Sequence, residues 1–550
     1  MESPKHAGDI AVAVSKVYGI ETMFTLSGGH VFPLYDGAVH EGVSILDVRH
    51  EQSAVFAAEA TARLTRRPGL AVLTAGPGVT NGVSGVATAH FNGSPVVVMG
   101  GRAPQSRWGS GALQEMDHPP LFAPITKLAF TSSGPDSIGE DVEMAFRTAL
   151  APHRGPVFLD FHMDHLFAAA QPLDHVTETL TPSPLEPDPD ALAGIARLIA
   201  EAERPVLVLG SDVWMDRAEE VARAFAEEFR LPVIPNGQGR GVLPAGHELL
   251  VTRARGLAFS QADLVIVAGA PMDFRLGYGW FGGKNGNPLA RVVHLADAPS
   301  QLTTHMEPSG VAAGDLSLVF WGLGTACNEA GVSPKGYAPW LSKLSEAAQA
   351  AVAADAGLLA SDSDPIHPVR IYGELGKVLA DDAVVIGDGG DFVSYAGKYV
   401  ESSQPGNWLD PGPYGCLGTG LGYAIAARLA RPSSQVALLL GDGAAGFSLM
   451  DVDTLVRHRL PVVMICGNNG MWGLEKHPMR MLYGYDVAAE LQPQCRYDQV
   501  VTALGGGGEL VTDPSEIGPA LRRAFDSGVP YLVNIATDPS VAYPRNTTGI

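Results

Sequence analysis

Two segments far apart in the sequence share one layout. Each runs from an apolar stretch through a glycine turn and a helical pattern to a proline and a second apolar stretch: AVLTAGPGVTNGVSGVATAHFNGSPVVVMG (Ala71–Gly100) and VALLLGDGAAGFSLMDVDTLVRHRLPVVMICG (Val436–Gly467). The spacings from Gly76 to Pro95 and from Asp442 to Pro461 are both 19 positions. Strands that alternate with helices predict a parallel sheet covered on both faces. We therefore expect two related α/β units near the two ends of the chain.

The same alternation continues between these units. At about 100–200 residues per domain, the chain should hold about three domains, and we predict three consecutive doubly wound parallel-sheet α/β domains at residues 1–165, 190–345 and 366–550. The expected linkers are the Pro-, Asp- and Thr-rich Leu166–Pro189 and an Ala-rich stretch that ends at Pro365. Strands are expected at Gly42–Val48, Gly69–Leu73 and Pro95–Met99, with a helix at Glu51–Arg67, and buried strands are expected at Pro205–Leu209, Leu264–Ala268 and Val292–Leu295.

Composition excludes several classes of function. The net charge of −22 argues against a nucleic-acid partner. No apolar run reaches the roughly 18 residues of a membrane span, and the N-terminus has no signal-peptide pattern. The 4 cysteines are scattered without a CxxC pair, which predicts a reducing, cytoplasmic location and argues against a cysteine-rich zinc site.

Oxygen-bearing side chains stand at the ends of two neighbouring predicted strands. Asp442 ends the strand in LLLGDGAAG, and Asn469 follows the next strand 27 positions later. Carboxylate, amide and backbone carbonyl oxygens are ligands that suit Mg²⁺, which takes its other ligands from water and phosphate. Glycines Gly441 and Gly443 would let backbone N–H groups approach a diphosphate at a helix N-terminus. The pattern predicts a metal–diphosphate site.

A simpler interpretation is that GDG is only a turn and that the two asparagines cap a helix. A second copy, Gly387-Asp388-Gly389, illustrates this, because Gly415 and no asparagine stands 27 positions after its aspartate. The combination of GDG with the asparagine pair is therefore the more specific signal.

With these motifs, the chain resembles the thiamine diphosphate-dependent enzymes, the superfamily of acetolactate synthase, benzaldehyde lyase and oxalyl-CoA decarboxylase. The resemblance covers all three regions and implies a pyrimidine-binding domain, a central domain and a diphosphate-binding domain. It implies that Asp442, Asn469 and the carbonyl of Met471 bind Mg²⁺. The other positions that match cofactor-binding residues are Gly76, Pro77, Asn81, Gly390, Asp391, Phe392, Gly415, Leu417, Gly441, Gly443 and Ala444.

The family's essential acid has a match in LDVRHEQSAVFAAEATAR. Glu51 lies there at a strand-to-helix junction, and the resemblance implies that it hydrogen-bonds N1′ of the cofactor. Without the family pattern, Glu51 would be only a favourable acid in a first helical turn. Gln114, in LQEMDH, matches a glutamine that faces the thiazolium. Since the two cofactor-binding domains normally come from different subunits, the resemblance also implies a homodimer or homotetramer.

The amino-acid sequences of several stretches indicate which reaction of the superfamily to expect. LGYAIAA (Leu421–Ala427) resembles the oxalyl-CoA decarboxylase and 2-hydroxyacyl-CoA lyase branch of the superfamily. CGNNGMWGLEKHPMRMLYGY, RYDQVVTALGG and VAYPR resemble actinobacterial 2-hydroxyacyl-CoA lyases that act on 2-hydroxyisobutyryl-CoA. This implies cleavage of a 2-hydroxyacyl-CoA to formyl-CoA and a ketone or aldehyde. One alternative is a carboligase or decarboxylase that acts on CoA-free 2-oxo acids. Another is a non-catalytic subunit of the same fold, against which the joint presence of Glu51, Asp442 and Asn469 argues.

Two residues are candidates for proton transfer to or from the substrate hydroxyl. Glu475 lies six positions after Asn469, where decarboxylases of the superfamily carry a catalytic glutamate. The alternative is a solvated glutamate paired with Lys476 or Arg480. His30, in LSGGHVFPL, matches a histidine of benzaldehyde lyase, although a lone histidine is more often structural.

Phosphate groups of an acyl-CoA substrate would need cations. Arg240, Arg253, Arg255 and Arg275 lie in the stretches where relatives bind a nucleotide, and Asp297 follows a predicted strand, where an acid can bind a ribose hydroxyl. Taken singly, a residue of this kind is more often a surface charge than a ligand. Because some relatives bind ADP in the central domain, ADP stays open as a ligand here.

Overall fold

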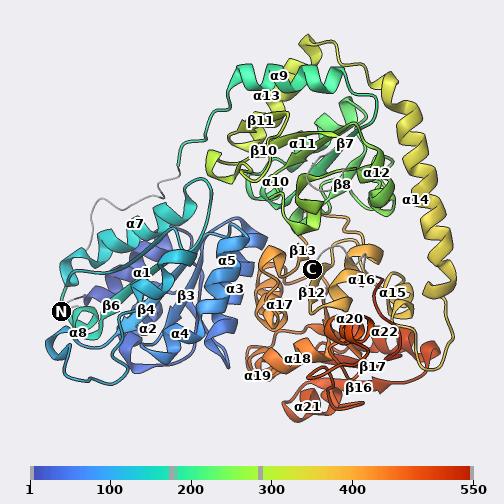
Figure 1. Cartoon of the computed structure of the whole chain (residues 1–550). Helices are drawn as coiled ribbons and strands as arrows, with labels where there is room; N and C mark the ends of the chain where they lie inside the picture. The colour runs from blue at the N-terminus through green and yellow to red at the C-terminus, as the bar shows by residue number, and fades with distance from the viewer. Residues whose placement is uncertain (1–4, 172–178, 180–181, 283–288, 545–550) are drawn as a thin grey trace.

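In a computed structural model of the chain, three parallel sheets follow one another along the sequence (Figure 1). The structure describes residues 5–171, 179, 182–282 and 289–544. Every strand pair in these residues is parallel. The predicted fold class, three doubly wound α/β domains, is confirmed.

The first sheet has the order β2-β1-β3-β4-β6-β5. Its strands are β1 (Thr22–Thr25), β2 (Ser44–Asp47), β3 (Gly69–Leu73), β4 (Val96–Arg102), β5 (Leu128–Thr131) and β6 (Val157–His162). The helices around it are α1 (Ala7–Val17), α2 (Phe32–Glu41), α3 (Glu51–Thr65), α4 (Pro77–Asn81), α5 (Val83–Phe91), α6 (Pro119–Phe122), α7 (Ile138–Leu150) and α8 (Met163–Phe167).

The central sheet has the order β11-β10-β9-β7-β8. Its strands are β7 (Pro205–Leu209), β8 (Val233–Pro235), β9 (Leu264–Ala268), β10 (Arg291–Ala296) and β11 (Gly310–Ala313). Its helices are α9 (Pro189–Ala200), α10 (Ser211–Met215), α11 (Glu219–Glu228), α12 (Arg255–Gln261) and α13 (Leu316–Glu329).

The third sheet has the order β13-β12-β14-β15-β17-β16, so it repeats the strand order of the first sheet. Its strands are β12 (Val384–Asp388), β13 (Trp408–Leu409), β14 (Val436–Gly441), β15 (Val463–Asn468), β16 (Gly507–Val511) and β17 (Tyr531–Ala536). Its helices are α15 (Val369–Leu375), α16 (Asp391–Tyr399), α17 (Thr419–Ala430), α18 (Asp442–Ser448), α19 (Val452–Arg457), α20 (Gly473–Tyr483), α21 (Tyr497–Ala503) and α22 (Ile517–Asp526).

The two connections between the domains differ in structure. Part of the first predicted linker, residues 172–178 and 180–181, lies outside the described residues. Most of the second predicted linker is the C-terminal part of a helix, α14 (Ala338–Leu359), which runs down beside the central domain and ends next to the third domain in Figure 1. An Ala-rich stretch has high helix propensity, so this segment forms a helix rather than an irregular linker.

The first and third domains pack against each other through α3 and α17. Gly422 on α17 makes this close approach possible, because a Cβ there would lie 2.7 Å from Cβ of Phe56 and 2.9 Å from the carbonyl of Ser53. Buried apolar residues of both domains form one continuous core around these helices. This contact fixes the position of the first domain relative to the third.

Candidate active site

A cavity of about 1030 Å³ opens at the carboxyl ends of β12, β14 and β15 and extends to the central domain. It brings together the predicted residues of the third domain. Those that line it are Gly390, Asp391, Phe392, Gly415, Leu417, Gly441, Asp442, Gly443, Ala444, Asn469, Met471 and Glu475.

Asp442 is the buried acid of this cavity. It begins α18, and its carboxylate accepts hydrogen bonds from the N–H of Gly470 at 2.8 Å and of Gly443 at 3.1 Å. Burial raises the pKa of Asp442 to about 6, although these N–H groups lower it. A cation at the carboxylate would offset the cost of burying its charge.

The two asparagines have different roles. Asn468 ends β15, and its amide donates to the carbonyl of Cys495 at 2.9 Å and to Oδ1 of Asn534 at 3.1 Å, so it ties neighbouring segments together. Asn469 lines the cavity, and its Oδ1 accepts from the N–H of Met471 at 3.2 Å. With Asp442 and the Met471 carbonyl, it offers the hard oxygen ligands that Mg²⁺ prefers.

Glycines leave room beside these ligands. A side chain at Gly443 would overlap the ring of Trp472, and one at Gly390 would overlap Leu474. Nothing lies within 4 Å of a Cβ built on Gly441 or Gly415. The open backbone at the start of α18 and the oxygen set together fit a diphosphate with its Mg²⁺. Trp472 and Leu474 were not predicted from the sequence, because an apolar side chain has no ligand or acid–base group that would mark it as part of a site.

The second GDG turn braces the site. The carboxylate of Asp388, fully buried at the end of β12, accepts from the N–H of Gly418 at 3.0 Å and of Gly420 at 2.8 Å. It thereby fixes the start of α17 directly after Leu417. Burial raises its pKa to about 6. Asp388 does not line the cavity, which agrees with its missing asparagine partner.

Glu51 lies in the first domain, at the N-terminus of α3. Its Oε2 accepts from the side-chain amide of Asn81 at 3.0 Å, and it is buried. A Cβ on Gly78 would lie 3.5 Å from Oε1, so the turn that starts α4 passes close to the acid. Glu51 does not line the cavity of the third domain within one chain.

His30 and Gln114 lie beside the same turn. A Cβ on Gly76 would lie 2.9 Å from Cβ of Gln114, and Nδ1 of His30 is 3.4 Å from Oγ1 of Thr74. Burial lowers the pKa of His30, so its imidazole is neutral near pH 7 and can accept a proton. The first-domain candidates therefore come together around Gly76 and Glu51.

Glu475 lies in the first turn of α20, with its side chain exposed at the cavity. The alternative partners have other carboxylates: Lys476 pairs with Glu490 and Arg480 with Asp486. The structure therefore does not support the surface ion pair that was the alternative for Glu475. Its role in proton transfer stays a prediction.

All four predicted arginines line the central-domain end of the cavity. Arg253 pairs with Asp355, and Arg275 makes two-pronged contacts with Asp273, the shortest at 2.7 Å. Arg240 donates to the carbonyl of Gly397 at 2.9 Å and lies over Trp408. Arg255 has no carboxylate partner among the residues that the structure describes.

Asp297 is not among the residues lining this cavity. Its carboxylate accepts from Nδ1 of His153 at 2.7 Å, across the contact between the first and central domains. A second cavity of about 630 Å³ lies at this contact and is lined by His153, Asp212 and Arg154 among others. His153 occupies Oδ2 of Asp297, whereas the buried Oδ1 has no hydrogen-bond partner among the described residues, so the ribose contact of Asp297 stays a prediction.

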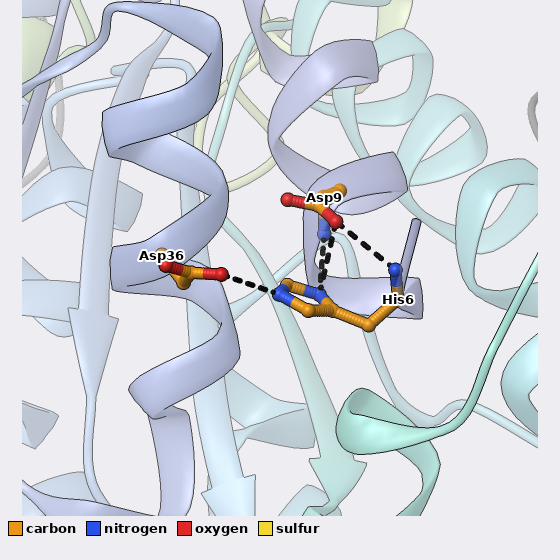
Figure 2. Close-up of side chains that lie close together, drawn as sticks. All are labelled: His6, Asp9 and Asp36. Carbon is orange, nitrogen blue, oxygen red and sulfur yellow. Dashed lines mark hydrogen bonds and ion pairs between the residues drawn. The ribbon is translucent and has the colours of Figure 1, made fainter. Parts of the chain in front are cut away.

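Another cluster of ligand-type side chains lies near the start of α1 (Figure 2). Nδ1 of His6 accepts from the N–H of Asp9 at 3.0 Å, so Nε2 carries the proton and donates to Asp36 at 3.0 Å. The carboxylate of Asp9 accepts from the N–H of His6, which completes a capping box. Both ring nitrogens have partners, and the cluster caps α1 and ties it to α2.

The fold and the site define a three-domain α/β protein whose cavity offers oxygen ligands and open glycine turns that would suit a metal-bound diphosphate. Models of the thiamine pyrophosphate enzymes match all three domains: the N-terminal TPP binding domain over residues 5–121, the central domain over 192–323 and the C-terminal TPP binding domain over 388–535. The chain therefore belongs to the thiamine pyrophosphate enzyme family, and its two binding domains indicate thiamine diphosphate as the cofactor. This confirms the resemblance found in the sequence.

Named relatives cover nearly the whole chain. A probable acetolactate synthase of Mycobacterium bovis is 49% identical over 98% of this chain and 97% of its own length. Proteins named 2-hydroxyacyl-CoA lyase 2 are 33% identical in Caenorhabditis elegans (96% and 88% of the two lengths) and 30% identical in Homo sapiens (97% and 90%). Neither these names nor the family descriptions mention ADP, so ADP has no support. No helix of the described residues is long and apolar enough to cross a membrane.

Proposed function

We propose that this enzyme is a Mg²⁺- and thiamine diphosphate-dependent carbon–carbon lyase. It cleaves a 2-hydroxyacyl-CoA, of the size of 2-hydroxyisobutyryl-CoA, to formyl-CoA and a ketone or aldehyde. The cavity supports this because it runs from the predicted metal ligands to a group of arginines in the central domain. The four free thiols are in keeping with a cytoplasmic location.

The observation that carries the proposal is the Arg255 guanidinium, which has no ion-pair partner among the residues that the structure describes. Burial, and then the neighbouring charges of Arg240 and Arg275, lower its pKa to about 10. Arg240, Arg255 and Arg275 are half-buried and line the same cavity, where they could bind an anion with several charges, such as the phosphates of coenzyme A. A CoA-free 2-oxo acid carries one carboxylate and no phosphate, so it would need fewer cations.

The residues of the third domain would hold the cofactor. Asp442, Asn469 and the Met471 carbonyl would bind Mg²⁺, and the glycine turns would admit the diphosphate. When bound, thiamine diphosphate supplies a carbanion nucleophile and an electron sink. Leu417 lies in the cavity wall, where it can press on the cofactor.

Proton transfers fall to side chains of this chain. Glu51 would share a proton with a ring nitrogen of the cofactor, and Gln114 would face the reacting centre. Glu475, or His30 in its place, would accept the proton of the substrate's 2-hydroxyl as the C1–C2 bond breaks. One proton leaves the 2-hydroxyl and one proton is added to C1. The products are therefore the ketone and formyl-CoA, and no water, oxidant or reductant is consumed.

We also propose that the active unit is at least a homodimer. Glu51 does not line the cavity within one chain, so a second copy would have to bring the acid to it. Exposed apolar side chains follow Glu475 along α20 and beyond it: Met481, Leu482, Tyr483, Tyr485 and Val487. Covering such a patch is favourable when a partner packs on it.

A second candidate is an acetolactate synthase-type reaction on CoA-free 2-oxo acids. The observation in its favour is the 49% identity to a protein named probable acetolactate synthase. The same cofactor and the same third-domain residues would serve either reaction, so the arginine end of the cavity is what separates the two.

Arg255→Gln tests the proposal. It should raise KM for 2-hydroxyisobutyryl-CoA by about 10-fold or more, because a charge-assisted bond to phosphate contributes roughly 1.5–3 kcal/mol. The pantetheine thioester of the same acid, which lacks the nucleotide phosphates, should be affected much less. Arg223→Gln, on the exposed side of α11, is the matched control. Equal KM changes for the two thioesters would contradict phosphate recognition by Arg255.

A further inference from the structure

The ring of His118 lies between the Gly76 turn and the first-domain sheet. Nε2 of His118 is 3.0 Å from the backbone N of Gly76, and Nδ1 is 2.8 Å from Oδ2 of Asp160 on β6. Both His118 and Asp160 are fully buried. The ring therefore connects a loop beside the candidate acid to the rigid core of the domain.

The two contacts fix the tautomer of His118. The backbone N–H of Gly76 can only donate, so Nε2 must be the unprotonated acceptor. The single proton of the neutral imidazole then sits on Nδ1 and is donated to Asp160. An imidazole protonated at Nε2 would place a donor against a donor and leave the Gly76 N–H unpaired in a buried site.

The Asp160 carboxylate is itself held in place. It accepts a second hydrogen bond from Nη1 of Arg102 on β4, at 3.1 Å. The same guanidinium donates to Asp117 at 2.9 Å and lies 4.0 Å from the ring centroid of Trp108. Two central strands of the sheet thus define the position of the histidine ring.

The Gly76 turn in turn positions the groups around Glu51. Gly76 has a φ of +57° and is the N-cap residue of α4. A Cβ there would meet Gln114, so Gly76 and Gln114 are packed directly against each other. At the other end of α4, the Asn81 amide holds Glu51 at 3.0 Å. A shift of this turn would move both Asn81 and Gln114.

We propose that His118 is a positioning residue, which acts as the Nδ1–H tautomer between Asp160 and Gly76 to hold the α4 turn, and through it Asn81, in register with Glu51. The inference rests on the role proposed above for Glu51. It does not depend on which substrate the enzyme cleaves, because it concerns the step that activates the cofactor.

Two variants separate the two contacts of the ring. Glutamine at position 118 can place an oxygen near the site of Nε2 and accept from Gly76, whereas asparagine can reach only the site of Nδ1 and leaves the Gly76 N–H unpaired. In the cofactor-free protein, backbone hydrogen exchange of residues 74–81 should be about 10- to 100-fold faster in His118→Asn. His118→Gln should stay within a few-fold of the parent. The exposed His305, changed to the same two residues, is the control.

Exchange of the C2 proton of bound thiamine diphosphate reports the consequence for the site. This exchange should be about 10- to 100-fold slower in His118→Asn, which loses the Gly76 contact. It should stay near the parent rate in His118→Gln, which loses only the Asp160 contact. If both variants slow C2 exchange to a similar extent, and the slowing follows the decrease in melting temperature, His118 has a purely structural role and the proposal is overturned.

Two further measurements keep the tests independent. A long-range ¹H–¹⁵N spectrum of the histidine-labelled parent should show His118 protonated at Nδ1 alone near neutral pH, and protonation at Nε2 would overturn the proposal even if the variants fail to fold. Glu51→Gln should slow C2 exchange. If it does not, the proposed role of Glu51 fails, while backbone exchange in the cofactor-free protein still decides the role of His118.

Discussion

Asp388 and Asp442 occupy similar GDG turns at the ends of adjacent strands, yet only Asp442 lines the cavity. Burial raises the pKa of each to about 6. Their surroundings differ: Asp388 accepts two N–H groups from the start of α17, whereas Asp442 has Asn469 beside it at the cavity. The spacing of Asp442 and Asn469 predicted this difference, because the corresponding position after Asp388 is a glycine.

Asp442→Ala tests the metal assignment. Loss of the only carboxylate among the proposed ligands should weaken Mg²⁺–thiamine diphosphate binding by about 100-fold, or roughly 2.7 kcal/mol. Isothermal titration against the parent measures it, with Asp381→Ala in the exposed turn before β12 as the control. Parent-like affinity in Asp442→Ala would rule the assignment out.

Glu475→Gln tests the proposed base. The change keeps the shape of the side chain but removes its proton acceptor, which should lower kcat for acyl-CoA cleavage by about 10²–10⁴-fold and leave KM nearly unchanged. C2 exchange should stay normal, because Glu51 is intact. Cleavage within a few-fold of the parent would leave His30 as the better candidate.

Strands and helices that show their whole apolar pattern within one short segment could be predicted from the sequence. β3, β7 and β9 have the predicted bounds, and α3 begins at the predicted residue and ends two residues early, at Thr65. What could not be predicted depends on contacts between distant elements. The brace from His118 to Gly76 joins residues 42 positions apart, and the pair of His153 with Asp297 joins two domains. Neither pair has a spacing that a sequence pattern could reveal.

The contact between the first and central domains should depend on pH. Burial, and then the charge of Asp297, raise the pKa of Asp212 to about 8, so the folded chain holds a proton that an unfolded aspartate releases near pH 4. The free energy of unfolding should therefore fall as the pH rises from about 4 to 8. Asp212→Asn cannot ionise, and its melting temperature should decrease less between pH 6 and pH 8 than that of the parent. Parallel curves for parent and variant would contradict the shift.

At the scale of the whole molecule, the first and third sheets share one strand order, and the repeated segments correspond to β3–β4 and β14–β15. The repeat was visible because both copies keep a strand, a turn, a helix and a strand at the same spacing. The cavity that joins the third and central domains was not visible, since it depends on how two folded domains meet. The four arginines could be named as candidates but not placed together.

We expect two chains to associate in solution. Light scattering should give at least twice the chain mass of 57.6 kDa. Leu482→Asp, in the exposed apolar segment after Glu475, should weaken the dimer and slow C2 exchange together, because burying a carboxylate in an apolar contact is costly. Leu289→Asp, which is also exposed, is the matched control. A parent that is monomeric with normal C2 exchange would contradict the shared site.

We propose that the cavity selects an acyl-CoA over a free 2-oxo acid. The most direct measurement compares kcat/KM for 2-hydroxyisobutyryl-CoA and for pyruvate on one preparation with Mg²⁺ and thiamine diphosphate, with the products identified. We expect equal amounts of acetone and formyl-CoA and a kcat/KM for the thioester at least about 100-fold above that for pyruvate, the discrimination expected from about 2.7 kcal/mol of added binding in the transition state. Acetolactate formation from pyruvate, with no cleavage of the thioester, would contradict it.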